Sequence, residues 1–290
     1  MTPLTPKGDV DVDAIRRVTD HLVGGGARGI FVLGSCGEGP SLTRAQRRIT
    51  TEAFVSAVAG RVPVLAGLAE TSVPRGREAL DDVTAAGADA VVLIAPYYFI
   101  GGGEEYVTAH LRLLAEASEL PVVLYNIPQL TQNSITPSVV EAIADVSTVR
   151  AIKDSSADWD QFSALAAIAK KHGLAMFQGA EALTARSILH GADGAVAGIA
   201  NVAPSLVAMV ISAAQAGDSA EAMRLQAHLD DVCRLYSAGF WLSALKVAMS
   251  ELGICDRHTV AGTPVLGPDQ VARVRAVTTE LLQEARPNVV

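Results

Sequence analysis

Several residue types are scarce in this sequence, and each scarcity argues against a class of protein. Three cysteines, Cys36, Cys233 and Cys255, are too few and too scattered for a disulfide framework or a CxxC metal site. The 23 basic residues are outnumbered by 31 acidic ones, and the net charge of −8 speaks against nucleic acid or an anionic membrane surface as a partner. No apolar run approaches the roughly 20 residues that span a bilayer, and the first residues do not form a secretory signal. We therefore expect a cytoplasmic protein.

What the sequence does contain is a long alternation of apolar runs and amphipathic segments. The alternation repeats every roughly 25 to 30 residues, which is the spacing of a (β/α)8 barrel. The runs are continuously apolar, as is typical of parallel strands that are buried on both faces. The predicted strands are residues 29–33, 62–66, 90–95, 122–125, 149–153, 174–178 and 194–198. The predicted helices of this part are residues 12–22, 43–59, 73–86, 104–118, 137–144, 159–172, 182–190 and 202–216.

Seven strands are clear, and the eighth has to be the first in the chain. Only residues 2–5 are available for it, so that strand is predicted to be very short. Beyond Gly217 the pattern is helical only, at residues 218–237, 241–252 and 268–284. The sequence thus predicts a (β/α)8 barrel over residues 1–217 and a C-terminal helical domain over residues 218–290.

Lys153 stands at the end of a buried strand, where an ammonium is costly. Only five of the 23 basic residues are lysines, so a composition that favours arginine keeps an amine at this place. A buried lysine tends to lose its proton and act as a nucleophile, and unlike arginine it can form an imine. The alternatives are a lysine that extends to solvent or one that pairs with Asp154.

The chemistry of such barrels lies where strands end and loops begin. After the strand at 29–33, a glycine-flanked turn carries Ser35 and Cys36, and its backbone N–H groups suit a carboxylate. It is alternatively a plain tight turn. Further strand ends place Gly37, Gly179, Glu181 and Gly198 on the same rim, where we expect them to contact substrate.

Three of the five tyrosines, Tyr97, Tyr98 and Tyr125, also fall at predicted strand ends. A buried phenol near an amine can relay protons, whereas a core phenol satisfies a single hydrogen bond. Their coincidence with a single rim lysine favours the catalytic interpretation.

The sequence lacks the residues that metal-dependent, nucleotide-dependent or cysteine-based catalysis would need at this rim. The six histidines fall on or beside helices or in the C-terminal part, so no metal site is expected at the rim. No GxGxxG or GxxxxGK[ST] motif follows a strand, which argues against nucleotide binding. Cys36 has no rim histidine to activate it, so a space-filling or carboxylate-contacting role is favoured over nucleophilic catalysis.

These motifs, in this order and spacing, resemble the dihydrodipicolinate synthase and N-acetylneuraminate lyase superfamily of pyruvate-dependent class I aldolases, over essentially the whole chain. The matching stretches are Thr2-Pro3-Leu4, Gly34-Ser35-Cys36-Gly37-Glu38, Pro96-Tyr97-Tyr98, Tyr125-Asn126-Ile127-Pro128 and Ile152-Lys153-Asp154.

The resemblance implies a role for each matching residue. Lys153 would form the Schiff base with pyruvate, so that no separate cofactor is needed, and Tyr125 would shuttle protons. Ser35 and Cys36 would hold the pyruvyl carboxylate. Tyr98 would cross a subunit interface to complete a proton relay, which implies a homo-oligomer, either a dimer or a tetramer.

Two departures from the family pattern bear on the substrate. Dihydrodipicolinate synthases carry an arginine two residues after the YNxP motif, and here Leu130 stands there. A leucine at this place resembles the sialic acid and 2-keto-3-deoxy sugar acid aldolases. The stretch Gly39-Pro40-Ser41-Leu42 resembles the 2-keto-3-deoxygluconate aldolase branch. Cys36 replaces the usual threonine.

We therefore expect a lyase that cleaves a 2-keto-3-deoxy sugar acid, or a similar 4-hydroxy-2-oxo acid, to pyruvate and an aldehyde. The alternatives are dihydrodipicolinate synthase (4-hydroxy-tetrahydrodipicolinate synthase), a dehydratase of the same superfamily, and, from another class, a non-catalytic barrel that binds sugar acids.

Overall fold

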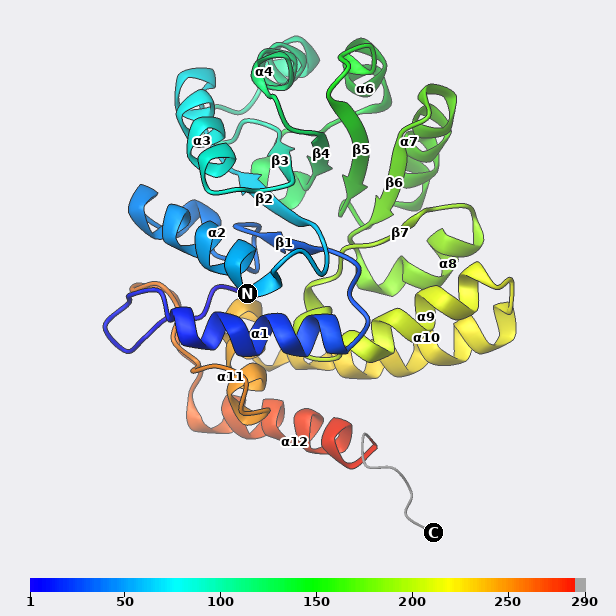
Figure 1. Cartoon of the computed structure of the whole chain (residues 1–290). Helices are drawn as coiled ribbons and strands as arrows, with labels where there is room; N and C mark the ends of the chain where they lie inside the picture. The colour runs from blue at the N-terminus through cyan, green and yellow to red at the C-terminus, as the bar shows by residue number, and fades with distance from the viewer. Residues whose placement is uncertain (285–290) are drawn as a thin grey trace.

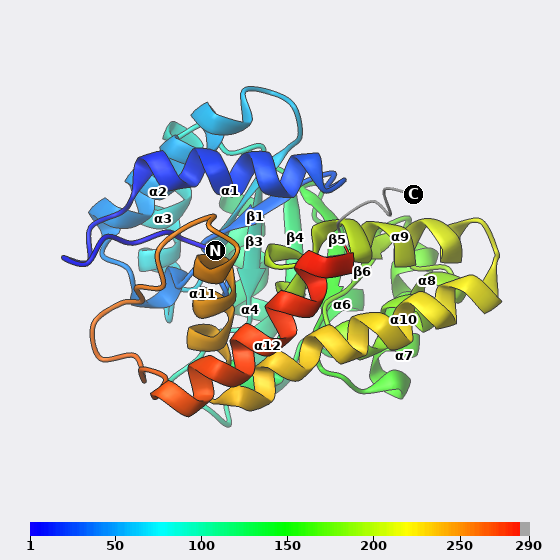
Figure 2. The same cartoon turned by 90° about the horizontal axis from the view of Figure 1, so that it is seen from below.

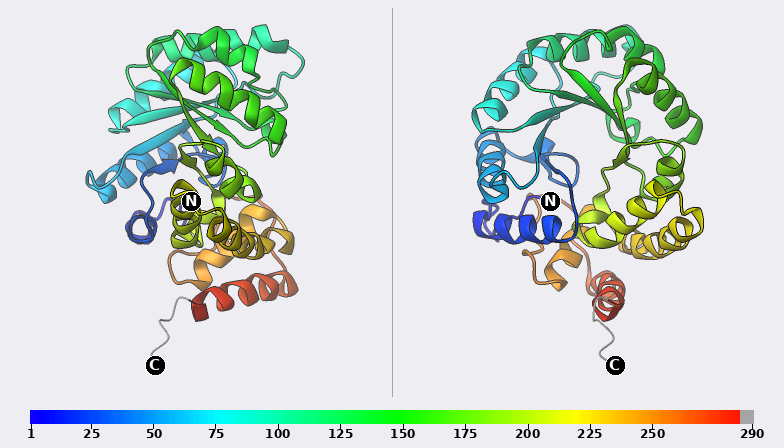
Figure 3. Two further views of the ribbon diagram at one scale, coloured as in Figure 1. Left: turned by 90° about the vertical axis from the view of Figure 1, so that its right-hand side faces the viewer. Right: turned by 45° about the vertical axis from the view of Figure 1, so that its right-hand side comes forward.

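The computed structural model describes residues 1–284 and contains one parallel sheet whose strands follow chain order. The sheet curls, and helices surround it on the outside (Figure 1, Figure 3). The strands are β1 (Ile30–Val32), β2 (Val64–Leu68), β3 (Ala90–Ile94), β4 (Val122–Asn126), β5 (Val149–Asp154), β6 (Ala175–Gln178) and β7 (Gly194–Ala195). The arrangement confirms the predicted barrel class, with seven strands contributed by the described residues.

The α-helices of the barrel part, apart from the short α5, lie close to their predicted positions. They are α1 (Val12–Gly24), α2 (Arg44–Val58), α3 (Val73–Ala85), α4 (Gly103–Ala117), α5 (Pro128–Thr131), α6 (Pro137–Ile143), α7 (Trp159–His172), α8 (Thr184–Leu189) and α9 (Pro204–Gln215). Three short 3-10 helices, η1 (Gly39–Ser41), η2 (Glu181–Leu183) and η3 (Gly198–Asn201), follow strand ends. Helix α5 and the 3-10 helices were not predicted from the sequence.

Local signals explain where individual helices begin and end. The Thr43 side chain accepts a hydrogen bond from the backbone N–H of Gln46, and the Gln46 side chain accepts one from the backbone N–H of Thr43. Together these bonds form a complete capping box at the start of α2. Asp158 accepts hydrogen bonds from the first turn of α7, and Gly173 ends that helix in the left-handed conformation. These signals depend on neighbouring residues only, so the sequence places the helices well.

Parallel pairing sets the site by bringing the carboxyl ends of neighbouring strands together. Tyr125 of β4 pairs in register with Lys153 of β5, which in turn pairs with Phe177 of β6. Tyr125 belongs to a small buried cluster that Phe31 and Phe177 pack against. The lysine therefore emerges among aromatic side chains.

The prediction of a first strand at residues 2–5 was wrong. Leu4 forms only an isolated antiparallel bridge with Val10, and neither residue joins the sheet. Within the described residues, the edges of β1 and β7 are not paired with each other. The strand predicted at 194–198 is also shorter, because the chain turns into η3 at Gly198. The space between β1 and β7 is continuous with the barrel interior.

The C-terminal helices pack against the barrel rather than standing apart from it (Figure 2). They are α10 (Ser219–Cys233), η4 (Arg234–Ala238), α11 (Trp241–Glu251) and α12 (Pro268–Glu284). Gln226 of α10 accepts a hydrogen bond from the backbone of Ala185, and apolar residues of both parts share one core. The division at residue 217 stays a prediction, and residues 285–290 lie outside the described part. Among the described helices, none combines the length and apolar character needed to cross a bilayer.

Candidate active site

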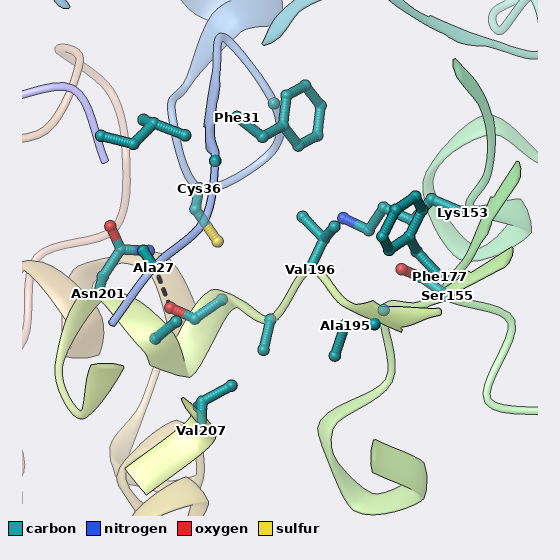
Figure 4. A pocket seen from close by; sticks show the side chains of 18 of the residues that line it. Ala27, Phe31, Cys36, Lys153, Ser155, Phe177, Ala195, Val196, Asn201 and Val207 are labelled. Carbon is teal, nitrogen blue, oxygen red and sulfur yellow. Dashed lines mark hydrogen bonds between the residues drawn. The ribbon is translucent and has the colours of Figure 1, made fainter. Parts of the chain in front are cut away.

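Lys153 is buried, with only 7% of its surface exposed. Its Nζ lies 3.9 Å from the centroid of the Tyr125 ring and 5.2 Å from that of Phe31, so the amine lies between two aromatic rings. Figure 4 shows the amine pointing into a cavity, toward Val196. Among residues 1–281, whose side chains the structure describes, no carboxylate oxygen lies within ion-pair distance of this amine. Asp154 instead accepts hydrogen bonds from Asn126 (2.6 Å) and Ser156 (2.7 Å). The pairing of Lys153 with Asp154 that the sequence left open is therefore absent.

Tyr125 lies beside Lys153 with its hydroxyl in a small polar pair. The phenol is buried, and its oxygen accepts a hydrogen bond from the hydroxyl of Ser155 at 3.4 Å. A phenol in this position has a proton partner and lies against the amine, so it can move a proton near the carbon that the amine attacks.

The Ser35–Cys36 turn borders the same cavity from the opposite side (Figure 4). The N–H of Glu38 donates to the carbonyl of Ser35 at 3.1 Å, and the carbonyl of Gly37 accepts from the Thr2 hydroxyl at 2.6 Å. No hydrogen bond to the described chain uses the N–H groups of Ser35 and Gly37, which leaves them for an anion. Burial raises the pKa of the Cys36 thiol, so it is a neutral donor rather than a thiolate nucleophile.

Two glycines at strand ends keep this cavity open. A Cβ on Gly179 would overlap the hydroxyl of Ser155 and lie 2.7 Å from Cε of Lys153. A Cβ on Gly198 would lie 2.9 Å from Sγ of Cys36 and 3.2 Å from Oε1 of Glu181. At each glycine at least one of these separations is below 3.0 Å, which is too short for a carbon atom, so a larger residue would have to displace the neighbouring side chains.

One cavity of about 1200 Å³ gathers nine of the ten predicted site residues. These are Ser35, Cys36, Gly37, Tyr125, Leu130, Lys153, Gly179, Glu181 and Gly198. Tyr98 does not line it, because its side chain is 79% exposed and packs edge-on against Phe99. Tyr97 also turns away, and its hydroxyl donates to the carbonyl of Ala69. Of the three rim tyrosines, only Tyr125 reaches Lys153.

Few charged groups line the cavity, and they lie either at the carboxyl ends or at the amino ends of the strands. Lys153 and Glu181 lie at the carboxyl ends of the strands, whereas Arg28 and Asp193 precede β1 and β7. The amino group of Met1 donates to Asn201 at 2.7 Å, and burial lowers its pKa. At the reactive end, Lys153 is thus the one cationic side chain among the cavity-lining residues.

Four contributing residues were missed by the sequence reasoning. Phe31 and Phe177 shape the surroundings of Lys153, and Ser155 bonds to Tyr125. Ser155 follows Lys153 by two positions, so a closer reading of that strand end could have found it. Tyr236 comes from η4, outside the barrel, and no local pattern points to it.

A family model described as the Dihydrodipicolinate synthetase family matches residues 1–276. The chain belongs to this family. Its enzymes are pyruvate-dependent carbon–carbon lyases of the aldolase type that use a lysine imine and no separate cofactor, and the protein is a lyase of this kind. The non-catalytic alternative is therefore not supported.

Individual members of this synthetase family are similar in sequence to this chain over most of their length. The chain is 31% identical to a 4-hydroxy-tetrahydrodipicolinate synthase of Phenylobacterium zucineum over 273 residues, which covers 93% of the chain and 90% of that relative. It is 34% identical to the Salinibacter ruber protein of the same name, covering 79% of the chain and 76% of that relative.

Solved structures of the family superpose closely. Dihydrodipicolinate synthase from Bacteroides thetaiotaomicron gives a TM-score of 0.91 at 31% identity and covers 97% of this chain and 96% of its own. YagE of E. coli, a prophage protein of the dihydrodipicolinic acid synthase family solved in complex with pyruvate, gives 0.91 at 27% identity with the same coverage.

Proposed function

We propose that Lys153 forms an imine with the keto carbon of pyruvate and that the protein catalyses reversible aldol chemistry between pyruvate and an aldehyde. The observation that carries the proposal is the position of the Lys153 amine. It is buried, points into the cavity, lies against Tyr125 and has no carboxylate partner among the described residues. An amine held in this way has few competing contacts and is free to attack a carbonyl carbon.

The proposed cleavage needs no reactant besides the substrate and water, which is released when the imine forms and is consumed when it is hydrolysed. The Lys153 amine adds to C2 of a 4-hydroxy-2-oxo acid, water leaves, and a protonated imine results. A base then takes the C4 hydroxyl proton, the C3–C4 bond breaks to release the aldehyde, and the electron pair moves to the imine nitrogen as an enamine. Protonation at C3 and hydrolysis return pyruvate and the free amine.

The neighbouring residues suit supporting roles in these steps. Tyr125 carries the proton to and from the C4 oxygen, with Ser155 as its hydrogen-bond partner. The N–H groups and hydroxyl of the Ser35–Cys36 turn receive the pyruvyl carboxylate, with Gly37 completing the turn. Gly179 and Gly198 leave the space that the substrate occupies.

Two aldehyde partners are candidates, and different observations favour them. The names of the relatives favour 4-hydroxy-tetrahydrodipicolinate synthase, which we expected as the alternative, over the sugar acid aldolase that we expected first. This synthase would take aspartate semialdehyde as its second substrate.

The residue at position 130 favours the 2-keto-3-deoxy sugar acid reaction. Leu130 lies on α5 at the cavity and offers no charge where the synthases carry the arginine that holds a second carboxylate. Since Lys153 is the one cationic side chain that the described residues bring to the reactive end of the cavity, an uncharged, hydroxylated aldehyde fits the site.

We also propose that the protein acts as a homo-oligomer. Tyr98, Phe99 and Ile100 form an exposed apolar group after β3, with 79%, 66% and 61% of their surfaces accessible. Such a group suits contact with a second copy, through which Tyr98 would reach the neighbouring cavity.

Borohydride reduction in the presence of pyruvate tests the imine directly. We expect the mass of the intact protein to increase by one reduced pyruvyl group, and peptide mapping to place that group on Lys153. A folded protein without an adduct, or with the adduct on another lysine, would contradict the mechanism. Assays of aspartate semialdehyde condensation and 2-keto-3-deoxygluconate cleavage then decide between the two partners.

A further inference from the structure

Glu181 brings a carboxylate to the reactive end of the cavity. It begins η2 directly after β6, and its Oε1 accepts two hydrogen bonds, one from the Tyr236 hydroxyl at 3.0 Å and one from the N–H of Ile199 at 3.2 Å. Among residues 1–281, whose side chains the structure describes, none donates a hydrogen bond to Oε2 or forms an ion pair with Glu181. One carboxylate oxygen is therefore fixed, and the other is free to accept a hydrogen bond from a ligand.

Tyr236 reaches this site from outside the barrel. It lies on η4, which follows α10 in the C-terminal helical part, and lines the same cavity as Lys153. Burial and the neighbouring carboxylate of Glu181 raise the pKa of Tyr236 far above its ordinary value. Its hydroxyl therefore keeps its proton and stays a donor to Glu181 at any pH at which the enzyme would be assayed.

Three polar groups converge where Gly198 leaves room. A Cβ at this position would lie 2.9 Å from Sγ of Cys36, 3.1 Å from the Tyr236 oxygen and 3.2 Å from Oε1 of Glu181. Cys36 belongs to the turn that we propose for the pyruvyl carboxylate. The Glu181–Tyr236 pair thus borders this turn, on the cavity wall that the C-terminal helices complete.

The charge of this wall selects among ligands. An aldehyde that carries its own carboxylate would meet the Glu181 carboxylate, and among the described cavity-lining residues no side chain other than Lys153 offers a positive charge at the reactive end. The Met1 amino group is already bonded to Asn201, and burial lowers the pKa of this amino group. An aldehyde that carries hydroxyl groups can donate to the free oxygen of Glu181 instead.

We propose that Tyr236 is a positioning residue, which fixes Glu181 as an acceptor for the hydroxyl groups of an uncharged aldehyde and thereby disfavours an aldehyde with a second carboxylate. This inference rests on the proposed aldolase function. It assigns to the C-terminal part a role in selecting the aldehyde and none in capturing pyruvate.

The test compares three single variants of the full-length protein with the wild type. Tyr236→Phe removes the hydroxyl and keeps the ring, Glu181→Gln removes the charge, and Tyr106→Phe removes a hydroxyl on α4 as the matched control. Each is assayed for pyruvate adduct formation with borohydride and for kcat and KM in aldol addition, with glyceraldehyde as the hydroxylated probe and aspartate semialdehyde as the carboxylated one.

We expect Tyr236→Phe to raise the KM for glyceraldehyde about tenfold, as the loss of a hydrogen bond to a charged group predicts, with kcat and pyruvate adduct formation within about twofold of wild type. Glu181→Gln is expected to lower the preference for glyceraldehyde over aspartate semialdehyde by about tenfold or more. Tyr106→Phe should leave every value unchanged.

Two results would overturn the inference alone. One is a Tyr236→Phe variant whose KM for both aldehydes equals that of wild type, and the other is a loss of adduct formation as large as the loss of aldol addition, which would indicate a structural role. A wild-type protein that forms no pyruvate adduct would overturn the aldolase function and this inference together, so the two failures are distinguishable.

Discussion

The ammonium of Lys246 lies 3.0 Å from Oε1 of Glu38, and both side chains are almost completely buried. Lys246 is on α11, whereas Glu38 ends the turn that carries Ser35 and Cys36. Lys246 also donates to the carbonyls of Thr2 and His258, and Oε2 of Glu38 accepts from the N–H of Val260 at 2.8 Å. The C-terminal helices are therefore tied to the turn through a buried ion pair.

Removing the cation of this pair should destabilise the protein strongly. We expect Lys246→Met to lower the free energy of unfolding by about 3 to 5 kcal/mol, because it leaves the Glu38 carboxylate buried without a partner. Urea unfolding measures the loss, and Lys246→Met combined with Glu38→Gln should recover part of it. Arg275→Met, which breaks the exposed pair with Glu251, is the control and should lower the free energy of unfolding far less, because water screens an exposed pair. Equal losses in the two single variants would contradict the prediction.

Substitution of Lys153 should abolish turnover while the fold persists. Neither alanine nor arginine can form the imine, and an arginine keeps the positive charge. Steady-state assays and circular dichroism of Lys153→Ala and Lys153→Arg check this, with Lys170→Ala on the exposed side of α7 as control. A variant at position 153 that retained a tenth of the wild-type rate would rule out the mechanism.

Loss of the Tyr125 hydroxyl should separate imine formation from proton transfer. We expect Tyr125→Phe to lower kcat by about 10² to 10⁴, the usual contribution of a general acid–base, while borohydride still traps pyruvate on Lys153. Ser155→Ala should have a smaller effect, since it removes only the hydrogen-bond partner of Tyr125. Rapid-quench kinetics with and without borohydride distinguish the two steps. An unchanged kcat in Tyr125→Phe would assign the proton transfer to another group.

An arginine at position 130 should shift the substrate preference. Leu130 is 55% exposed, so the longer side chain fits without loss of packing. We expect Leu130→Arg to lower the KM for aspartate semialdehyde by about tenfold, because it adds a guanidinium that can hold the second carboxylate. Leu130→Met serves as the uncharged control. If both variants behave alike, the charge at this position does not select the aldehyde.

The stability of the protein should fall as the pH drops from about 6.5 to about 4, in part because of His110. This histidine is buried on α4, and desolvation lowers its pKa to about 4 from 6.5. In that window the unfolded chain binds a proton that the folded protein does not, so the free energy of unfolding falls with the pH. Since one pKa unit corresponds to about 1.4 kcal/mol, the loss should reach about 3 kcal/mol. Urea unfolding of wild type and His110→Gln between pH 4 and pH 7 checks this, and equal slopes would exclude His110.

The sequence by itself determined the barrel and the position of the lysine that we propose as the nucleophile. Helix caps such as Thr43 and Asp158 act over one turn, and the apolar pattern of a parallel strand is local, so the elements fall where the pattern predicts. Lys153 was found because a buried strand that ends in lysine is unusual. Tyr97, Tyr98 and Tyr125 were all expected at the same rim, because the equivalent ends of parallel strands meet at one edge, and the family resemblance singled out Tyr125 among them.

Contacts between distant segments were decided only by the tertiary structure. Tyr236 bonds to Glu181 across 55 positions, and Lys246 pairs with Glu38 across the junction of barrel and C-terminal helices. Tyr98 is at a strand end like Tyr125 but turns to the surface. No local pattern fixes such contacts, because they depend on how whole elements pack and on the cost of burying a charge without its partner. The sequence therefore determined the fold and the amine, whereas packing decided which groups surround it.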